Sequence, residues 1–153
     1  MPRTSAGFLL YRLTDHGPEV LLVHPGGPFW TNKDAGAWSI PKGEYGDDED
    51  PQAAARRELA EELGSLPALG EPIDLGEVKQ PGGKIVHAWA AEGDFDPATL
   101  HSNTFEMQWP PRSGQMQEFP EVDRAEWFTP DEAREKINPA QAAFIDRLLE
   151  RLR

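Results

Sequence analysis

The sequence GEYGDDEDPQAAARRELAEELG, residues 43–64, joins a loop rich in carboxylates to the residues of a good helix. Pro51 suits the first turn of a helix that has Asp50 as its N-cap, and Gly64 is placed to end that helix. Alanine and leucine, both strong helix formers, dominate the positions between them. The stretch therefore predicts a loop followed by a helix over residues 51–63.

Three carboxylates lie on one side of the predicted helix. Glu58, Glu61 and Glu62 are spaced i, i+3 and i+4, so they project within one turn of each other. On an exposed helix such like charges cost only about 0.2–0.5 kcal/mol each, and Arg56 and Arg57 offer partial neutralisation. Two interpretations follow: a solvated helix with local ion pairs, or oxygen ligands that converge on Mg²⁺ or Mn²⁺.

The loop before the helix favours the second interpretation, because its residues complete a longer motif. The motif is Gly, five residues, Glu, seven residues, then R-E-U-x-E-E-x-G-U, where U is a bulky apolar residue. Here it is carried by Gly43, Glu49, Arg57, Glu58, Leu59, Glu61, Glu62 and Gly64. The chain thus resembles the Nudix hydrolase family. Ser65 departs from the final apolar position, where we expect weaker packing and unchanged chemistry.

The resemblance implies an α/β protein with the Nudix fold, a mixed β-sheet sandwiched between α-helices, as one domain over residues 1–153. The rest of the sequence agrees with it. Residues 5–13 and 19–25 read as a hairpin, residues 73–95 as a second one turning at Pro-Gly-Gly, and residues 104–109 and 125–128 as further strands. Helices are expected from residue 130 and over residues 139–153. This irregular order favours a mixed sheet over repeated βαβ units.

The resemblance also implies a reaction, in which water attacks phosphorus and cleaves a nucleoside diphosphate from another group. The cofactor would be Mg²⁺ (or Mn²⁺). By the same resemblance Glu58, Glu61 and Glu62 are metal ligands, the Gly43 carbonyl is a further ligand, and Glu58 or Glu61 is the general base. Arg57 would orient the helix carboxylates, and Glu49 would hold the loop through Arg57.

A glutamate before a late strand completes the metal site in several Nudix enzymes. Glu121 precedes the strand expected at residues 125–128, at a spacing similar to that in diadenosine tetraphosphate hydrolases. Glu118 is the reserve candidate, and an ordinary loop carboxylate is the alternative to both. We therefore expect Glu121 to be a metal ligand.

Residues outside the motif bear on the substrate. Lys42 stands in a Pro-Lys-Gly entry that resembles the one in Nudix enzymes acting on dinucleoside polyphosphates and on diphosphoinositol phosphates. We expect Lys42 to contact a distal phosphate, the alternative being a solvated loop lysine, and Arg112 to be another phosphate contact. Stacking on a nucleobase is open to several aromatic rings: Phe29, Trp30, Trp38, Tyr45 and Trp109. Three functions remain open: hydrolysis of derivatives such as dinucleoside polyphosphates, removal of oxidised nucleoside triphosphates, and non-catalytic nucleotide sensing. Retention of every motif carboxylate favours an enzyme.

The composition of the chain argues against some classes of binding partner. The formal net charge of −12 argues against binding a nucleic-acid polymer, which requires clustered cations. The chain has no cysteine and no apolar run near the roughly 18 residues of a membrane span, and its amino terminus lacks the pattern of a signal peptide. We expect a cytoplasmic protein that binds a small molecule and no membrane.

Overall fold

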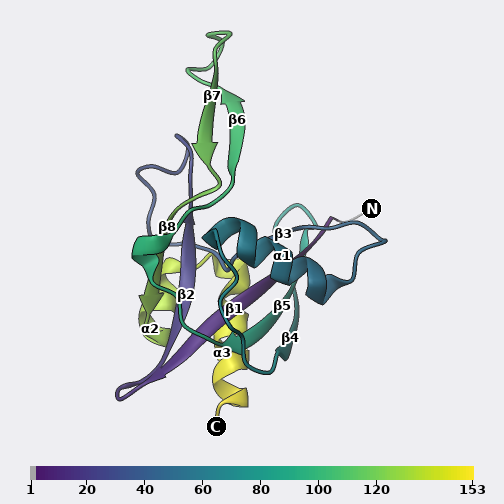
Figure 1. The fold of residues 1–153 in the computed structure, drawn as a ribbon, viewed down its shortest axis with the longest axis vertical. Helices are drawn as coiled ribbons and strands as arrows, with labels where there is room; N and C mark the ends of the chain where they lie inside the picture. Colours follow the sequence, from purple (N-terminus) through teal and green to yellow (C-terminus); the bar gives the residue numbers. More distant parts are fainter. Residues whose placement is uncertain (1–2) are drawn as a thin grey trace.

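A six-stranded mixed sheet forms the centre of the computed structural model, which describes residues 3–153 (Figure 1). Its strands are β1 (Thr4–Thr14), β2 (Gly17–Pro25), β3 (Lys42–Glu44), β4 (Ile73–Lys79), β5 (Ile85–Glu92) and β8 (Val122–Phe128). The order is β4-β5-β1-β2-β8, with β3 beside β1. Only the β1–β5 pair is parallel among these described pairings, so the predicted mixed sheet is confirmed.

Both predicted hairpins are present. β1 pairs with β2, and β4 pairs with β5 with an irregular register between Asp74 and Gly76. The parallel pairing of β1 with β5 joins the two hairpins, and the sequence did not indicate it. β1 is consequently the central strand, and the apolar run Phe8–Leu10 on it is fully buried.

The helix α1 (Pro51–Leu63) covers one face of the sheet. The Asp50 side chain accepts a hydrogen bond from the Ala53 amide at 3.0 Å, and Gly64 ends the helix in the left-handed conformation with φ 89°. The predicted bounds and both caps are confirmed. The apolar stripe of α1 packs with the β1 side chains that point to this face, in a cluster that includes Ala54, Leu59, Leu63, Phe8 and Leu10.

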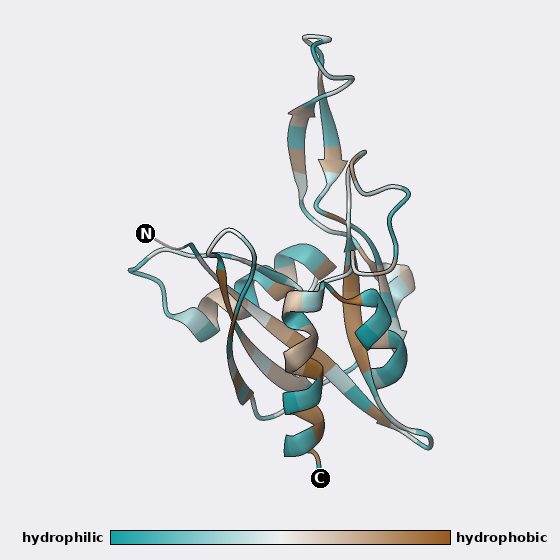
Figure 2. Cartoon of the chain, turned by 180° about the vertical axis from the view of Figure 1, so that it is seen from behind, coloured by the Kyte–Doolittle hydropathy of each residue, from teal (hydrophilic) through white to brown (hydrophobic). Residues whose placement is uncertain are grey.

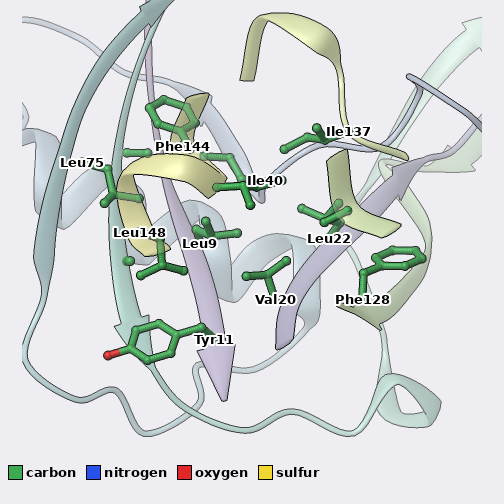
Figure 3. Packing of buried hydrophobic residues seen from close by; sticks show 14 of the residues in the cluster. Leu9, Tyr11, Val20, Leu22, Ile40, Leu75, Phe128, Ile137, Phe144 and Leu148 are labelled. Atoms are coloured by element: carbon green, nitrogen blue, oxygen red, sulfur yellow. The ribbon is translucent and has the colours of Figure 1, made fainter. Parts of the chain in front are cut away.

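The other face of the sheet is covered by α2 (Pro130–Lys136) and α3 (Ala142–Arg151). Figure 3 shows Phe144 and Leu148 of α3 in one cluster with Leu9 and Tyr11 of β1. Burying one such side chain contributes about 1.5–3 kcal/mol. The helix expected over residues 139–153 begins with a 3₁₀ turn, η2 (Pro139–Gln141), and another 3₁₀ turn, η1 (Pro97–Thr99), lies after β5. None of the helices within residues 3–153 is long and apolar enough to cross a membrane.

A two-stranded hairpin, β6 (Thr104–Gln108) and β7 (Met116–Pro120), projects from the body (Figure 1). Phe105 and Phe119 face each other across it, with ring centroids 6.0 Å apart. The loop between β2 and β3 leans on this hairpin, since Phe29 meets Trp109 edge to face at 5.6 Å. Figure 2 shows that the hairpin alternates hydrophilic and hydrophobic residues. Its first strand was predicted and its second was missed.

Candidate active site

Two glycines bring β3 close to its neighbours. β3 lies on the edge of β1 with Gly7 opposite Lys42 and Ala6 opposite Gly43. A Cβ atom on Gly7 would lie 2.4 Å from the Pro41 carbonyl oxygen. A Cβ atom on Gly43 would lie 2.2 Å from both carboxylate oxygens of Glu58. The absence of these two side chains therefore allows the Glu58 carboxylate of α1 to rest directly on the backbone of β3.

Arg57 links the acidic loop to the helix. Its Nε and Nη2 atoms donate to the two carboxylate oxygens of Glu49 at 2.8 and 2.9 Å. Its Nη1 atom donates to Glu58 at 3.0 Å and to Glu61 at 3.3 Å. Such charge-assisted, bidentate contacts fix both partners in orientation. These contacts are available for the predicted roles of Arg57 as orienter of the helix carboxylates and of Glu49 as holder of the loop, and the roles themselves stay predictions.

A cavity of about 310 Å³ collects most of the residues that the sequence proposed for the site. It is lined by Lys42, Gly43, Glu44, Glu58, Glu61, Glu62, Asn103 and Glu121. The four proposed carboxylate ligands, Glu58, Glu61, Glu62 and Glu121, thus line the same cavity as the Gly43 backbone. Asn103 was not predicted, because a single polar residue in a loop carries no distinguishing signal in the sequence.

The crowding of carboxylates shifts their protonation. Burial, followed by the charge of Glu61, raises the pKa of Glu58. Burial also raises the pKa of Glu62 to about 8, despite the neighbouring charge of Lys42. The pKa of Glu121 is raised for the same two reasons as that of Glu58. A cation in the cavity would reverse this destabilisation of the charged forms.

The structure distinguishes Glu121 from Glu118. Glu121 lies at the foot of the hairpin, on the cavity wall, and its backbone amide donates to the Asn103 carbonyl at 2.9 Å. Glu118 lies on β7, exposed and opposite Glu106 of β6. Glu121 is therefore the glutamate that the fold places with the carboxylates of α1.

Two predicted substrate contacts are not brought to the cavity. Trp38 is only 1% exposed, its indole N–H donates to Asp34 at 2.8 Å, and its ring packs on Phe128 in the core. Arg112 lies in the exposed turn between β6 and β7, with φ 63°. The sequence marked both residues by type alone, and residue type does not tell a core indole from a ligand contact.

A second cavity, of about 290 Å³, adjoins the first at Lys42. Three side-chain amides, those of Gln80, Asn138 and Gln141, line it together with the ring of Trp30. Gln141 is fully buried; its Oε1 atom accepts from the Ile40 amide at 3.0 Å, and its Nε2 atom donates to Gln80 at 2.9 Å. These amides were not predicted, although a glutamine at the start of an otherwise apolar helix face was a usable signal for Gln141.

The donor set of the first cavity fits a hard divalent cation. Every carboxylate and carbonyl group available there offers oxygen, which Mg²⁺ and Mn²⁺ prefer to nitrogen and sulfur. Among residues 3–153, however, no three acidic or imidazole side chains are already drawn together as a metal centre. Arg57 instead neutralises Glu58 and Glu61. The residues that line the first cavity are therefore chemically suited to Mg²⁺ or Mn²⁺. Within the protein itself, Arg57 is the cation that pairs with two of these carboxylates.

Comparison with known proteins identifies the family. The NUDIX domain model matches residues 1–148, so the chain belongs to the NUDIX domain family. Among curated proteins, an 8-oxo-(d)GTP phosphatase of Mycolicibacterium smegmatis is 36% identical over 108 residues, which is 61% of this chain and 31% of that protein. The chain therefore spans about a third of the length of this relative.

Solved structures share the fold at low sequence identity. A Caenorhabditis elegans Ap4A hydrolase binary complex superposes with a TM-score of 0.67 at 20% identity, over 97% of each chain. The NUDIX domain of Shewanella oneidensis NrtR, complexed with ADP ribose, superposes with a TM-score of 0.61 at 17% identity, over 100% of this chain and 90% of that one. These likenesses establish the Nudix fold, as the sequence predicted.

Proposed function

We propose that this protein is a divalent metal-dependent pyrophosphohydrolase that cleaves a nucleoside diphosphate from the group attached to it. The observation that carries the proposal is the single cavity in which Glu58, Glu61, Glu62 and Glu121 surround the Gly43 backbone beside Lys42. Four carboxylates in one cavity, two of them neutralised by Arg57, favour binding of a cation, and phosphates bind where such a cation is held.

Each residue then has a task. Glu58, Glu61, Glu62, Glu121 and the Gly43 carbonyl would hold Mg²⁺ or Mn²⁺, which supplies Lewis acidity to the phosphate and acidifies water. Glu58 or Glu61 takes the proton from the attacking water, and the geometry is equally open to both. Arg57 keeps these two carboxylates in orientation. The Lys42 ammonium, between the two cavities, binds a phosphate oxygen of the chain that passes from one to the other.

The second cavity bears on the substrate. The side-chain amides of Gln80 and Asn138 and the Trp30 ring offer hydrogen bonds and an apolar surface, which suit a nucleobase or sugar attached to the phosphates. The buried Gln141 amide supports them by its bond to Gln80. The relative named 8-oxo-(d)GTP phosphatase favours an oxidised nucleoside triphosphate, whereas the fold of Ap4A hydrolase leaves dinucleoside polyphosphates as the other candidate. Nucleotide sensing without catalysis is disfavoured, since all the carboxylates are in place.

The test is hydrolysis of a nucleotide panel by the whole chain. 8-oxo-dGTP, dGTP, diadenosine tetraphosphate and ADP-ribose are incubated with Mg²⁺ or with a chelator, and the products are separated by chromatography. We expect turnover only with Mg²⁺. The Glu61→Gln variant, which keeps the shape and removes a charge, should lose about a hundredfold in rate or more.

The matched control is Glu106→Gln, the same change on the exposed face of the hairpin, which should leave the rate unchanged. No turnover of any substrate by wild type, or equal rates for Glu61→Gln and Glu106→Gln, would refute the proposed hydrolase. A sensor would bind panel members with Mg²⁺ and release no product.

A further inference from the structure

A short segment, residues 101–103, closes the carboxyl end of α1. The His101 amide donates to the Leu63 carbonyl at 3.1 Å, and the Asn103 amide donates to the Glu61 carbonyl at 2.9 Å. Carbonyls in the last turn of a helix lack partners within the helix, so these two bonds satisfy them. Gly64 permits this approach, because a Cβ atom there would lie 2.3 Å from the His101 carbonyl oxygen.

The other side of the same segment holds the backbone around Glu121. The Glu121 amide donates to the Asn103 carbonyl at 2.9 Å, and the Val122 amide donates to the Ser102 hydroxyl oxygen at 3.1 Å. The Ser102 hydroxyl in turn lies 3.1 Å from the Val122 carbonyl and 2.8 Å from the Asn103 carbonyl, and donates to one of them. Segment 101–103 therefore ties Glu121 to the helix that carries the other carboxylates.

The sheet side supplies a different anchor, the bond from the Gly26 amide to the Glu121 carbonyl at 2.9 Å. The ladder between β2 and β8 is regular as far as His24 opposite Arg124, and then shifts so that Pro25 stands opposite Val122. Proline has no amide hydrogen, and the irregularity interrupts the ladder where β8 begins. Val122 is 4% exposed, so its amide needs a partner inside the protein, and the Ser102 hydroxyl is that partner.

We propose that Ser102 is a positioning residue of the active site, which sets the Glu121 carboxylate against the carboxylates of α1. The inference rests on the proposed function, in which Glu121 is a metal ligand. Without the hydroxyl, the Val122 amide loses its acceptor, and the start of β8 is held to segment 101–103 by the bond from the Glu121 amide to the Asn103 carbonyl alone. The Glu121 side chain is then less firmly placed on the wall of the cavity, and the affinity for the cation falls.

The test measures Mn²⁺ binding directly, by electron paramagnetic resonance of the free ion, in a double-mutant cycle. The proteins are wild type, Ser102→Ala, Glu121→Gln and the double variant, with Ser102→Thr as the variant that keeps the hydroxyl. We expect Ser102→Ala to weaken Mn²⁺ binding about tenfold and Ser102→Thr to restore it. In the Glu121→Gln background, Ser102→Ala should have no further effect, because the residue acts through Glu121.

Ser113→Ala is the matched control. The Ser113 hydroxyl oxygen also accepts from a backbone amide, that of Gln115 at 3.1 Å, but in the exposed turn at the far end of the hairpin. Its removal should leave Mn²⁺ affinity unchanged. Thermal unfolding of every variant separates a general loss of stability from a loss confined to the cation.

The possible failures are distinct. If wild type binds no Mn²⁺, or if Glu121→Gln binds it as tightly as wild type, the metal role of Glu121 in the proposed function is wrong and the inference goes with it. If Glu121→Gln weakens binding but Ser102→Ala does not, or if the two losses add fully in the double variant, only the positioning role of Ser102 is overturned.

Discussion

At the scale of single residues, position 43 needs a glycine because the Glu58 carboxylate occupies the space of a Cβ atom, and not because the backbone there has a conformation that only glycine favours. The space that a Cβ atom would fill is already taken by the end of the Glu58 side chain. That end is flexible, so an added methyl group can push it aside without disturbing the core. A glycine that is needed for chemistry and one that is needed for folding should therefore respond differently to the same substitution.

Gly43→Ala should cost activity and little stability. We expect Glu58 to leave its place and hydrolysis to fall by about a hundredfold, as for a displacement of about 1 Å in a reacting group. Gly83→Ala, in the open turn between β4 and β5 at φ 83°, should do the reverse, losing about 1 kcal/mol of stability at unchanged rate. The measurements are the hydrolysis rate and the thermal unfolding of both variants. A large loss of stability in Gly43→Ala would show that Gly43 is needed for folding and not only for the position of Glu58.

Helices and strands could be predicted from the sequence where the residues that define them are close together in the chain. Asp50 and Gly64 define α1 because caps act on the neighbouring backbone, and β1, β2, β4 and β5 follow from apolar runs bounded by turns. β7 was missed because Gln117, Glu118 and Pro120 lack a strand pattern and pair only because β6 lies beside them. The role proposed for Ser102 was equally hidden, since it depends on contact between segments about twenty positions apart.

The helix α2 carries a capping box whose contribution depends on pH. The Thr129 amide donates to the Glu132 carboxylate at 3.0 Å, and the Glu132 amide donates back to the Thr129 hydroxyl at 3.3 Å. The bond from the Thr129 backbone, followed by the bond from its hydroxyl, lowers the pKa of Glu132. A lowered pKa means that ionised Glu132 stabilises the fold above its ordinary pKa, and that this contribution disappears as the pH falls through the lowered value.

Glu132→Gln should therefore lower the melting temperature at pH 7 and lose its effect in acid. The measurement is thermal unfolding of wild type and variant at pH 7 and at roughly pH 2–3, below the usual carboxyl range. Glu150→Gln, the same change at an exposed position of α3, should be neutral at both values. An equal deficit of Glu132→Gln at the two pH values would show that the charge of the capping box is immaterial.

On the scale of the whole molecule, a net charge of −12 opposes compaction, and five of the acidic side chains line the candidate active-site cavity. A cation bound there should stabilise the entire chain. At a concentration a hundredfold above its dissociation constant, the gain is about 2.7 kcal/mol, or roughly 5–10 °C in melting temperature for a chain of this size.

Magnesium should thus raise the melting temperature of wild type by that amount above a sodium chloride control of equal ionic strength. The control is needed because any salt screens exposed charges. Glu62→Gln should lose most of the rise and should melt higher than wild type in chelator, because it removes one half-buried carboxylate that faces Glu58 and Glu121. A rise of equal size in sodium chloride alone would exclude a specific site.

The hairpin of β6 and β7 leaves the body and returns to it at nearly one point, since the Asn103 carbonyl and the Glu121 amide are 2.9 Å apart. The residues between them form an insertion whose two ends are joined by this backbone hydrogen bond. Closing a loop of different length between the same two ends changes the free energy of folding only slowly, by about 0.6 kcal/mol per doubling of the loop length. Residues 104–120 can therefore be shortened, lengthened or replaced by a reporter segment, and variation in their length changes what stands beside the candidate site without changing the residues that line it on α1 and β3.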